Sequence, residues 1–296
     1  MKILPSCGVS GLALGAIFLA SGCSTATVKP VTTPPTDGPT STGPICPTNP
    51  DDVISDFNLD NGVHQVDGRS GGWYTYGDMS GRGTLVPAQG AKVNPDLTVG
   101  NTDNCPGDLG SLHVKAMGFI DWGAAFGVDF VPAVPTDAGV MAKGTYDATK
   151  YKGVSFWAKA SAPVRFVQVS FKDPYTDVPS ILPDIVTQWC VFQGKMPNTC
   201  SPYLVKFGYG YETDANVAAD YPAYARYKLD TTWKRFEVLF ADTKQDRYNL
   251  GQKDPGDKLN LAQLTGMSIQ ANSDQSTVPP TANDWEIWID DVTFIH

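Results

Sequence analysis

Short runs of alternating apolar and polar residues recur along most of this 296-residue chain. Gly, Pro, Asn and Asp stand between the runs and favour turns there. No amphipathic helix of ten or more residues stands out, so the pattern predicts an all-β sandwich or barrel. The clearest runs cover residues 53–57, 72–77, 111–117, 153–160, 164–171, 233–240, 266–272 and 285–295.

The last run, WEIWIDDVTFI, has the composition of a β-strand but carries two adjacent aspartates in its middle. Regular alternation places Asp291 on the face of Ile287 and Ile289. A bulge at the aspartates would instead join these isoleucines with the apolar positions that follow. Both alternatives leave a carboxylate near the interior, where it needs a partner: calcium, backbone N–H groups or an arginine.

The first 22 residues have the features of an export leader: Lys2, then an apolar stretch, then small residues that end at Cys23. The apolar stretch is too short and too rich in Gly for a comfortable membrane span. LASGC, at 19–23, resembles the bacterial lipobox, which implies acylation of Cys23. Ser24 implies, by the same resemblance, sorting to the outer membrane of a bacterial cell envelope. An ordinary secretory leader with an incidental cysteine is the alternative.

The segment 23–50 has a composition that cannot bury a core. Among residues 24–50, seven are Pro, eight are Thr and two are Ser. Such chains stay extended and solvated, so we expect a disordered tether. The remaining residues, 51–296, are enough for a domain with a sizeable core.

Charge and motif content narrow the function. The net charge of −9 argues against nucleic acid and anionic polymers as partners and suits neutral ligands. The chain has three His and three Glu, and it lacks a P-loop, an HExxH motif and a dinucleotide fingerprint. An enzyme is therefore the weaker reading, although an Asp pair able to hydrolyse or cleave a polysaccharide stays open.

Four cysteines remain beyond the leader and Cys23, which allows three disulfide pairings. Cys190 and Cys200 flank a stretch with Gly and Pro that suits a turn, so we expect them to pair. Cys46 would then pair with Cys105 and tie the end of the tether to the domain.

Five motifs resemble a known family in their order: DF-x-x-D-x-G at 56–62, GGWYTY at 71–76, YKGVSFWAK at 151–159, TTWKRFEVLFAD at 231–242 and WIDDVTF at 288–294. The series is similar to the galactose-binding-domain-like carbohydrate-binding modules of the family-eleven type and to related bacterial envelope lipoproteins. The resemblance implies a two-sheet antiparallel jelly-roll β-sandwich that binds polysaccharide. It also implies a structural calcium, whose candidate ligands are Asp56, Asn58, Asp60 and Asp291.

Exposed aromatic rings on a rigid sheet suit the apolar faces of sugar rings, and neighbouring amides suit the hydroxyl groups. A tryptophan in a β-sandwich is nevertheless more often buried in the core than exposed as a platform on which a sugar could stack. The Tyr-rich stretch 203–227 is a further candidate for an aromatic rim. The candidate carbohydrate-binding residues are Trp73, Tyr74, Tyr76, Trp122, Gln168, Trp189, Gln270 and Trp288.

These observations favour a lipid-anchored protein outside the cytoplasm that attaches to a neutral polysaccharide. It would touch the membrane through its anchor alone and hold the cell, or an associated carbohydrate-active enzyme, against the polymer. An envelope interaction or structural lipoprotein is the alternative, and a polysaccharide-degrading hydrolase or lyase is the next. Buried tryptophans throughout would favour the structural protein.

Overall fold

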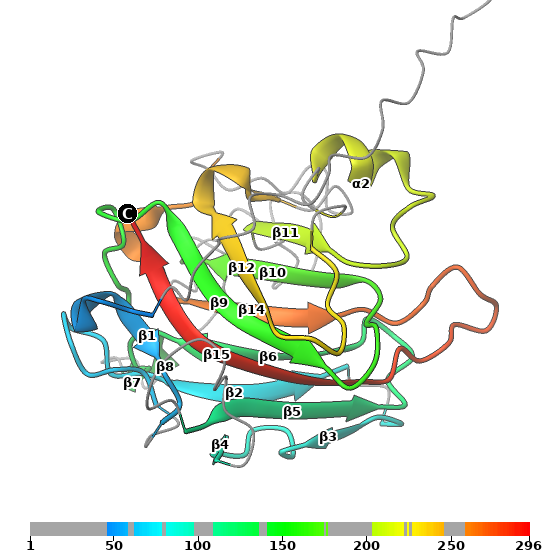
Figure 1. The fold of residues 1–296 in the computed structure, drawn as a ribbon, viewed down its shortest axis with the longest axis horizontal. Helices are drawn as coiled ribbons and strands as arrows, with labels where there is room; N and C mark the ends of the chain where they lie inside the picture. Colours follow the sequence, from blue (N-terminus) through cyan, green and yellow to red (C-terminus); the bar gives the residue numbers. More distant parts are fainter. Residues whose placement is uncertain are drawn as a thin grey trace, which may run out of the picture. The chain divides into compact units, whose positions relative to one another are not determined.

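Two antiparallel β-sheets packed face to face form the fold in a computed structural model (Figure 1). The all-β sandwich predicted from the alternating pattern is therefore confirmed. No helix in the described part of the chain has the length and apolarity needed to cross a bilayer. The structure describes residues 46–58, 62–78, 81–97, 109–135, 141–174, 176, 203–221, 224, 227–245 and 258–296, without the side chains of 141 and 142.

The first sheet, sheet A, has seven strands within these residues, in the order β12-β9-β15-β5-β3, with β1 beside β15 and β4 beside β5. The long C-terminal strand β15 is its centre, and it pairs with β5 on one side and β9 on the other. The strands of sheet A are β1 (Val53–Ser55), β3 (Thr84–Val86), β4 (Pro95–Asp96), β5 (Ser111–Met117), β9 (Gly153–Ala160), β12 (Lys234–Leu239) and β15 (Trp285–Ile295).

In the described part of the chain, the second sheet, sheet B, has six strands in the order β13-β11-β10-β14-β6-β2. Outside the two sheets are the strand pair β7 (Val134–Pro135) and β8 (Met141–Ala142), the 3₁₀ turns η1 (Pro50–Asp52), η3 (Phe240–Asp242) and η5 (Leu261–Gln263), and the short helix α2 (Ala215–Asp220). The strands of sheet B are β2 (Gly72–Gly77), β6 (Ala124–Asp129), β10 (Val167–Lys172), β11 (Tyr203–Phe207), β13 (Lys244–Gln245) and β14 (Gly266–Ala271).

The alternating runs at 72–77, 111–117, 153–160 and 285–295 coincide with β2, β5, β9 and β15. The alternating pattern did not predict strand β6. Its residues 124–128 are all buried, so apolar and polar residues do not alternate there. A strand buried on both faces has no period-2 signal to read.

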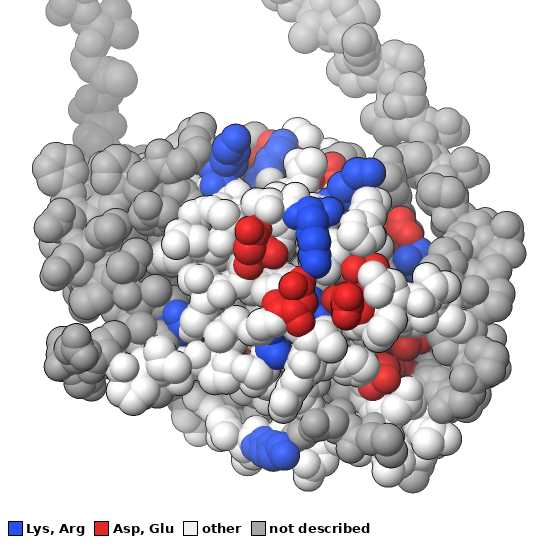
Figure 2. All heavy atoms as spheres, turned by 90° about the vertical axis from the view of Figure 1, so that its left-hand side faces the viewer, with Lys and Arg blue, Asp and Glu red and all other residues white. Residues whose placement is uncertain are grey.

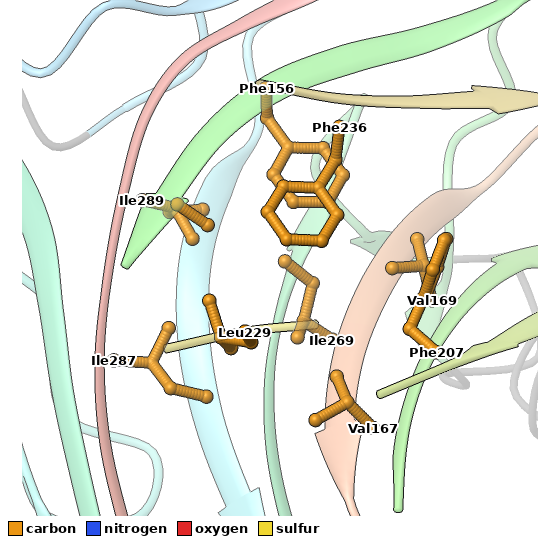
Figure 3. A pocket seen from close by; sticks show the side chains of 10 residues that line it. Phe156, Val167, Val169, Phe207, Leu229, Phe236, Ile269, Ile287 and Ile289 are labelled. Carbon is orange, nitrogen blue, oxygen red and sulfur yellow. The ribbon is translucent and has the colours of Figure 1, made fainter. Parts of the chain in front are cut away.

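The inward faces of the two sheets form one apolar core. Figure 3 shows a part of it in which Phe156 and Phe236 of sheet A stack with ring centroids 5.3 Å apart. Ile287 and Ile289 of β15 and Val167, Val169 and Ile269 of sheet B line the same space. The space left there is about 10 Å³, no more than one water molecule needs, so the region between the sheets is core rather than a ligand site.

The question posed by the two aspartates is answered by a β-bulge. The pairing of β15 with β9 shifts register between Asp290 and Thr293, and Asp291 has a left-handed φ of +48°. The bulge brings Val292 and Phe294 to the buried side with Ile287 and Ile289, all four at 2% exposure or less. The bulged alternative is confirmed, and regular alternation through the aspartates is wrong.

A buried arginine fastens the first strand. Arg69, 1% exposed, donates from Nη2 to the carbonyl oxygens of Asp51 and Val53, at 2.8 and 2.9 Å, and from Nη1 to the Tyr146 hydroxyl at 2.8 Å. Tyr146 donates to Asp67, and burial raises the pKa of its hydroxyl, which therefore stays a donor. The network satisfies a charge that would otherwise be costly to bury.

Candidate functional site

The outward face of sheet B carries two rows of side chains that cross β2, β6, β14 and β10. The pairing register places Tyr74, Gly127, Ser268 and Ser170 in the first row. The second row holds Tyr76, Ala125, Gln270 and Gln168. Residues directly opposite one another on paired strands have Cβ atoms about 5 Å apart, so the side chains of each row are neighbours. Tyr74, Tyr76 and Gln270 are half-buried, and the other five residues are buried. We call these eight residues the sheet B rows.

Three aromatic rings follow one another at the β2 edge of these rows. Tyr74 and Tyr76 lie on the same face of β2, with ring centroids 5.8 Å apart. Trp122 lies in the loop before β6, with its ring centroid 5.9 Å from that of Tyr76. Trp122 is 37% exposed, and the two tyrosines are half-buried. Three aromatic rings thus follow one another, two on the edge strand β2 and one on the neighbouring loop.

Two lysines that we did not predict accompany the rings. Lys172 Nζ lies 5.3 Å from the ring centroid of Tyr76, and Lys143 Nζ lies 5.5 Å from that of Tyr74. Lys143 also pairs with Asp129 at 2.9 Å. The alternation in VQVSFK, which puts Gln168, Ser170 and Lys172 on one face of β10, is the signal that would have found Lys172.

Small and amide side chains form the floor of the face. Gly127 lets β14 lie close to β6, because a Cβ there would lie 2.9 Å from the Met267 carbonyl oxygen and 3.0 Å from Ser268 Cβ. Ser170 and Ser268 hydrogen-bond to each other at 2.7 Å. Gln168 is 7% exposed, and its Oε1 has no hydrogen-bond partner among the described residues.

The opposite edge of the same face is covered. Leu204 of β11 packs with Tyr211, Val217 and Tyr221, all four buried, in a cluster to which α2 contributes Val217. Figure 1 shows α2 and β11 near each other at one end of the sheet. Lys206, in register with Gln168, lies over the rings of Tyr211 and Tyr221.

The expectation of an aromatic rim at 203–227 is wrong for three of its tyrosines. Tyr211 and Tyr221 are 6% and 3% exposed because they build this secondary cluster, and Tyr203, 4% exposed, belongs to the main core between the sheets.

Two of the predicted platform residues lie elsewhere. Trp73 is 4% exposed and faces the core, where its Nε1 donates to Ser55 Oγ at 2.8 Å. Trp288 belongs to sheet A, where it stacks on His113 with ring centroids 4.3 Å apart, and Lys159 Nζ lies 5.3 Å from its ring centroid. Cross-strand neighbours from β5 and β9 flank Trp288, which is half-buried. The expectation that Trp73 is an exposed platform residue is wrong because its ring is core, whereas a binding role of Trp288 stays a prediction.

Of the predicted calcium ligands, Asp56 pairs with His64 at 3.1 Å. The hydrogen bond from His64 lowers the pKa of Asp56. Asn58 accepts the backbone N–H of Leu109 at 2.6 Å, and Asp291 lines a cleft with Trp157 and Arg235. Within the described residues, no three acidic, His or Cys side chains converge as a metal site would require.

Several predicted residues lie outside the described part of the chain. They are Asp60, Trp189, Cys23, Cys105, Cys190 and Cys200. Both disulfide pairings, the lipid anchor and the boundaries of the leader and the tether therefore stay predictions. Cys46 is described, and it lines the same cleft as Asp291.

The charges near the site are of both signs. On the left-hand side of Figure 1, which Figure 2 shows from the front, Lys and Arg of the described residues lie among Asp and Glu. At the sheet B rows themselves, the aromatic edge adjoins the Lys143–Asp129 pair and Lys172. Stacking on flat rings, together with hydrogen bonds to amides and hydroxyls, is the chemistry that this surface offers.

No family model matches the chain, and no curated protein does. Among solved structures, it is similar to the family 11 carbohydrate-binding module of the cellulosomal cellulase Lic26A-Cel5E of Clostridium thermocellum, at 13% identity and a TM-score of 0.39 over 82% of this chain and 92% of that one. It is also similar to the family 30 module of the cellulase Cel9D-Cel44B of the same organism, at 11% identity and a TM-score of 0.40 over 75% and 90%. The family that the sequence motifs resemble is thus among the similar structures.

Proposed function

We propose that this protein binds a polysaccharide through the outward face of sheet B, with Tyr74, Tyr76 and Trp122 as the stacking surface. The observation that carries the proposal is the succession of these three rings, with centroids 5.8 and 5.9 Å apart, beside a floor of small and amide side chains. Sugar rings have an apolar face and polar edges, and this surface presents a matching group for each.

The strand geometry explains why such a surface would favour a polymer. The rings are held on one sheet edge, so little side-chain freedom is lost when they contact a ligand. A contact of this kind contributes about 1 kcal/mol beyond burial. Several contacts along one chain are then needed for useful affinity, which a polysaccharide supplies and a monosaccharide does not.

The remaining parts of the proposal rest on the sequence. The net charge of −9 favours a neutral polymer. Acylation at Cys23 and the Pro- and Thr-rich segment after it would attach the domain to the bacterial envelope, at the outer membrane, on a flexible tether. In this arrangement the protein would hold the cell, or an associated carbohydrate-active enzyme, against the polysaccharide.

The test is affinity electrophoresis of the full chain, purified in mild detergent, in native gels that contain mixed-linkage β-1,3-1,4-glucan, xylan, galactomannan or polygalacturonate. We expect retardation by at least one neutral polymer and not by polygalacturonate. Tyr76→Ala and Trp122→Ala should each weaken retardation several-fold without unfolding the protein.

Trp288→Ala is the matched control, because it removes an aromatic ring from the other sheet. It should leave retardation unchanged. Loss of retardation in Trp288→Ala alone would place the site on sheet A and overturn the proposal. A wild-type protein that none of the polymers retards would favour the envelope structural protein instead.

A further inference from the structure

The loop that carries Trp122 is held by one buried carboxylate. Asp78, 5% exposed, follows β2 directly, and its Oδ2 accepts the backbone N–H groups of Asp121 at 2.8 Å and Gly123 at 3.3 Å. These residues flank Trp122 on both sides. The backbone N–H of Asp78 also donates to the Gly123 carbonyl oxygen at 2.9 Å. Asp78 therefore clamps both ends of the tripeptide whose middle residue presents the ring.

The same loop is held from the end of β14. Gln275 Nε2 donates to the carbonyl oxygen of Ile120 at 3.2 Å, Ser273 Oγ donates to that of Asp121, and Gln270 Nε2 lies 3.5 Å from that of Trp122. Gly123 has a φ of +104°, and a Cβ there would lie 2.2 Å from the Ala271 carbonyl oxygen. The loop thus passes too close to β14 for any other residue at this position.

We infer that Asp78 is a positioning residue for ligand binding: it sets the orientation of Trp122 beside Tyr76 and does not touch the ligand itself. Hydrogen bonds to an ionised acceptor are stronger than neutral ones, and a buried clamp of this kind stops the loop from sampling other conformations. A fixed ring loses little freedom on binding, whereas a mobile ring must be ordered each time. The inference rests on the proposed function for its consequence in binding, but the clamp itself can be tested without a ligand.

The first arm of the test uses no sugar. The near-ultraviolet circular dichroism of each protein is compared with that of its Trp122→Phe counterpart, so that the difference reports how rigidly Trp122 is held. We expect a clear difference band in the wild type and in Asp78→Asn, which keeps an oxygen acceptor, and loss of the band in Asp78→Ala. A band that persists in Asp78→Ala would overturn the inference, whatever the protein binds.

The second arm measures retardation by mixed-linkage β-1,3-1,4-glucan, xylan and galactomannan. Asp78→Ala should weaken retardation about as much as Trp122→Ala does, Asp78→Asn should restore most of it, and Asp78→Ala should cause no further loss in a protein that already carries Trp122→Ala. Additive losses would contradict a role that acts through Trp122. If Trp122→Ala and Tyr76→Ala leave retardation unchanged, the proposed function is wrong. The first arm still shows whether Asp78 holds Trp122 in place.

Asp173 provides a matched control at the other end of sheet B. It is fully buried and accepts the backbone N–H groups of Thr176 at 3.1 Å and Asn260 at 3.0 Å. Asp173→Ala should lower the melting temperature without changing retardation or the Trp122 band. If it weakens retardation as Asp78→Ala does, general destabilisation explains both, and the positioning role is refuted. Should Asp78→Ala fail to fold, Asp78→Ser replaces it, because its shorter side chain cannot reach both N–H groups.

Discussion

Replacing Trp73 by Ala tests which way strand β2 faces, and with it the placement of the site. The Trp73 ring is 4% exposed, and its centroid lies 5.4 Å from that of Phe57 and 6.3 Å from that of Phe126. Truncation of a buried tryptophan leaves a cavity in a close-packed core and costs about 3–5 kcal/mol of unfolding free energy. For a domain of this size, this loss lowers the melting temperature by about 10 °C.

The hydrogen bond from the Trp73 indole makes a smaller contribution to the unfolding free energy, which can be measured separately. Trp73 Nε1 donates to Ser55 Oγ at 2.8 Å, inside the protein. Trp73→Phe keeps an aromatic ring in the core but removes this donor, so it should cost about 1–3 kcal/mol. The assay is urea unfolding followed by far-ultraviolet circular dichroism, with the midpoint and slope fitted for each variant.

Tyr76→Ala is the internal control, because it lies on the same strand and faces outward. It should lower stability much less than Trp73→Ala and weaken polysaccharide retardation much more. The reasoning would be refuted if Trp73→Ala kept the wild-type urea midpoint but lost retardation. That result would mean that the indole, and not the two tyrosines, faces the ligand.

Further predictions concern the bulge, the anchor, the acid limb of stability and the floor of the site. Millimolar calcium should raise the melting temperature of the wild-type protein. Asp291→Asn should abolish this rise, and Asn tolerates the left-handed φ at this position. If a chelator does not change the melting temperature of the purified protein, the calcium prediction is wrong. Cys23→Ser should move the protein from the detergent phase to the aqueous phase in a partitioning assay, and equal partitioning of both forms would rule out the lipid anchor. The hydrogen bond from Lys150 lowers the pKa of Asp67, so its contribution to stability is present above about pH 3.8, the ordinary pKa of this group, and is lost as the pH falls through the lowered value. Asp67→Asn should therefore reduce the decrease in unfolding free energy at acid pH, and an unchanged pH dependence of the unfolding free energy would contradict this. Gly127→Val should clash with the β14 backbone at Met267 and lower the melting temperature, and an unchanged melting temperature would contradict this.

The alternating pattern alone was sufficient to locate most of the strands and the shared faces within each. Alternation puts Tyr74 and Tyr76 on the same face of β2. It puts Gln168 and Gln270 on the faces opposite the main apolar residues of their strands. The physical reason is local: side chains in a strand alternate sides with a period of two, whatever the strand pairs with. The bulge was also within reach as an alternative, because only a bulge puts Ile287 and Ile289 on the same side as Val292 and Phe294.

The tertiary structure decided which face of a strand points outward and which sheet the strand joins. In GWYTYG both faces carry large aromatic residues, so composition could not tell that Trp73 is core and Tyr76 is surface. Trp288 looked equivalent to Tyr76 in the sequence, but pairing between strands far apart in the chain put it in the other sheet, between His113 and Lys159. Strand register depends on contacts across the whole fold, and the burial of a ring depends on what packs over it, so neither can be read from a period of two.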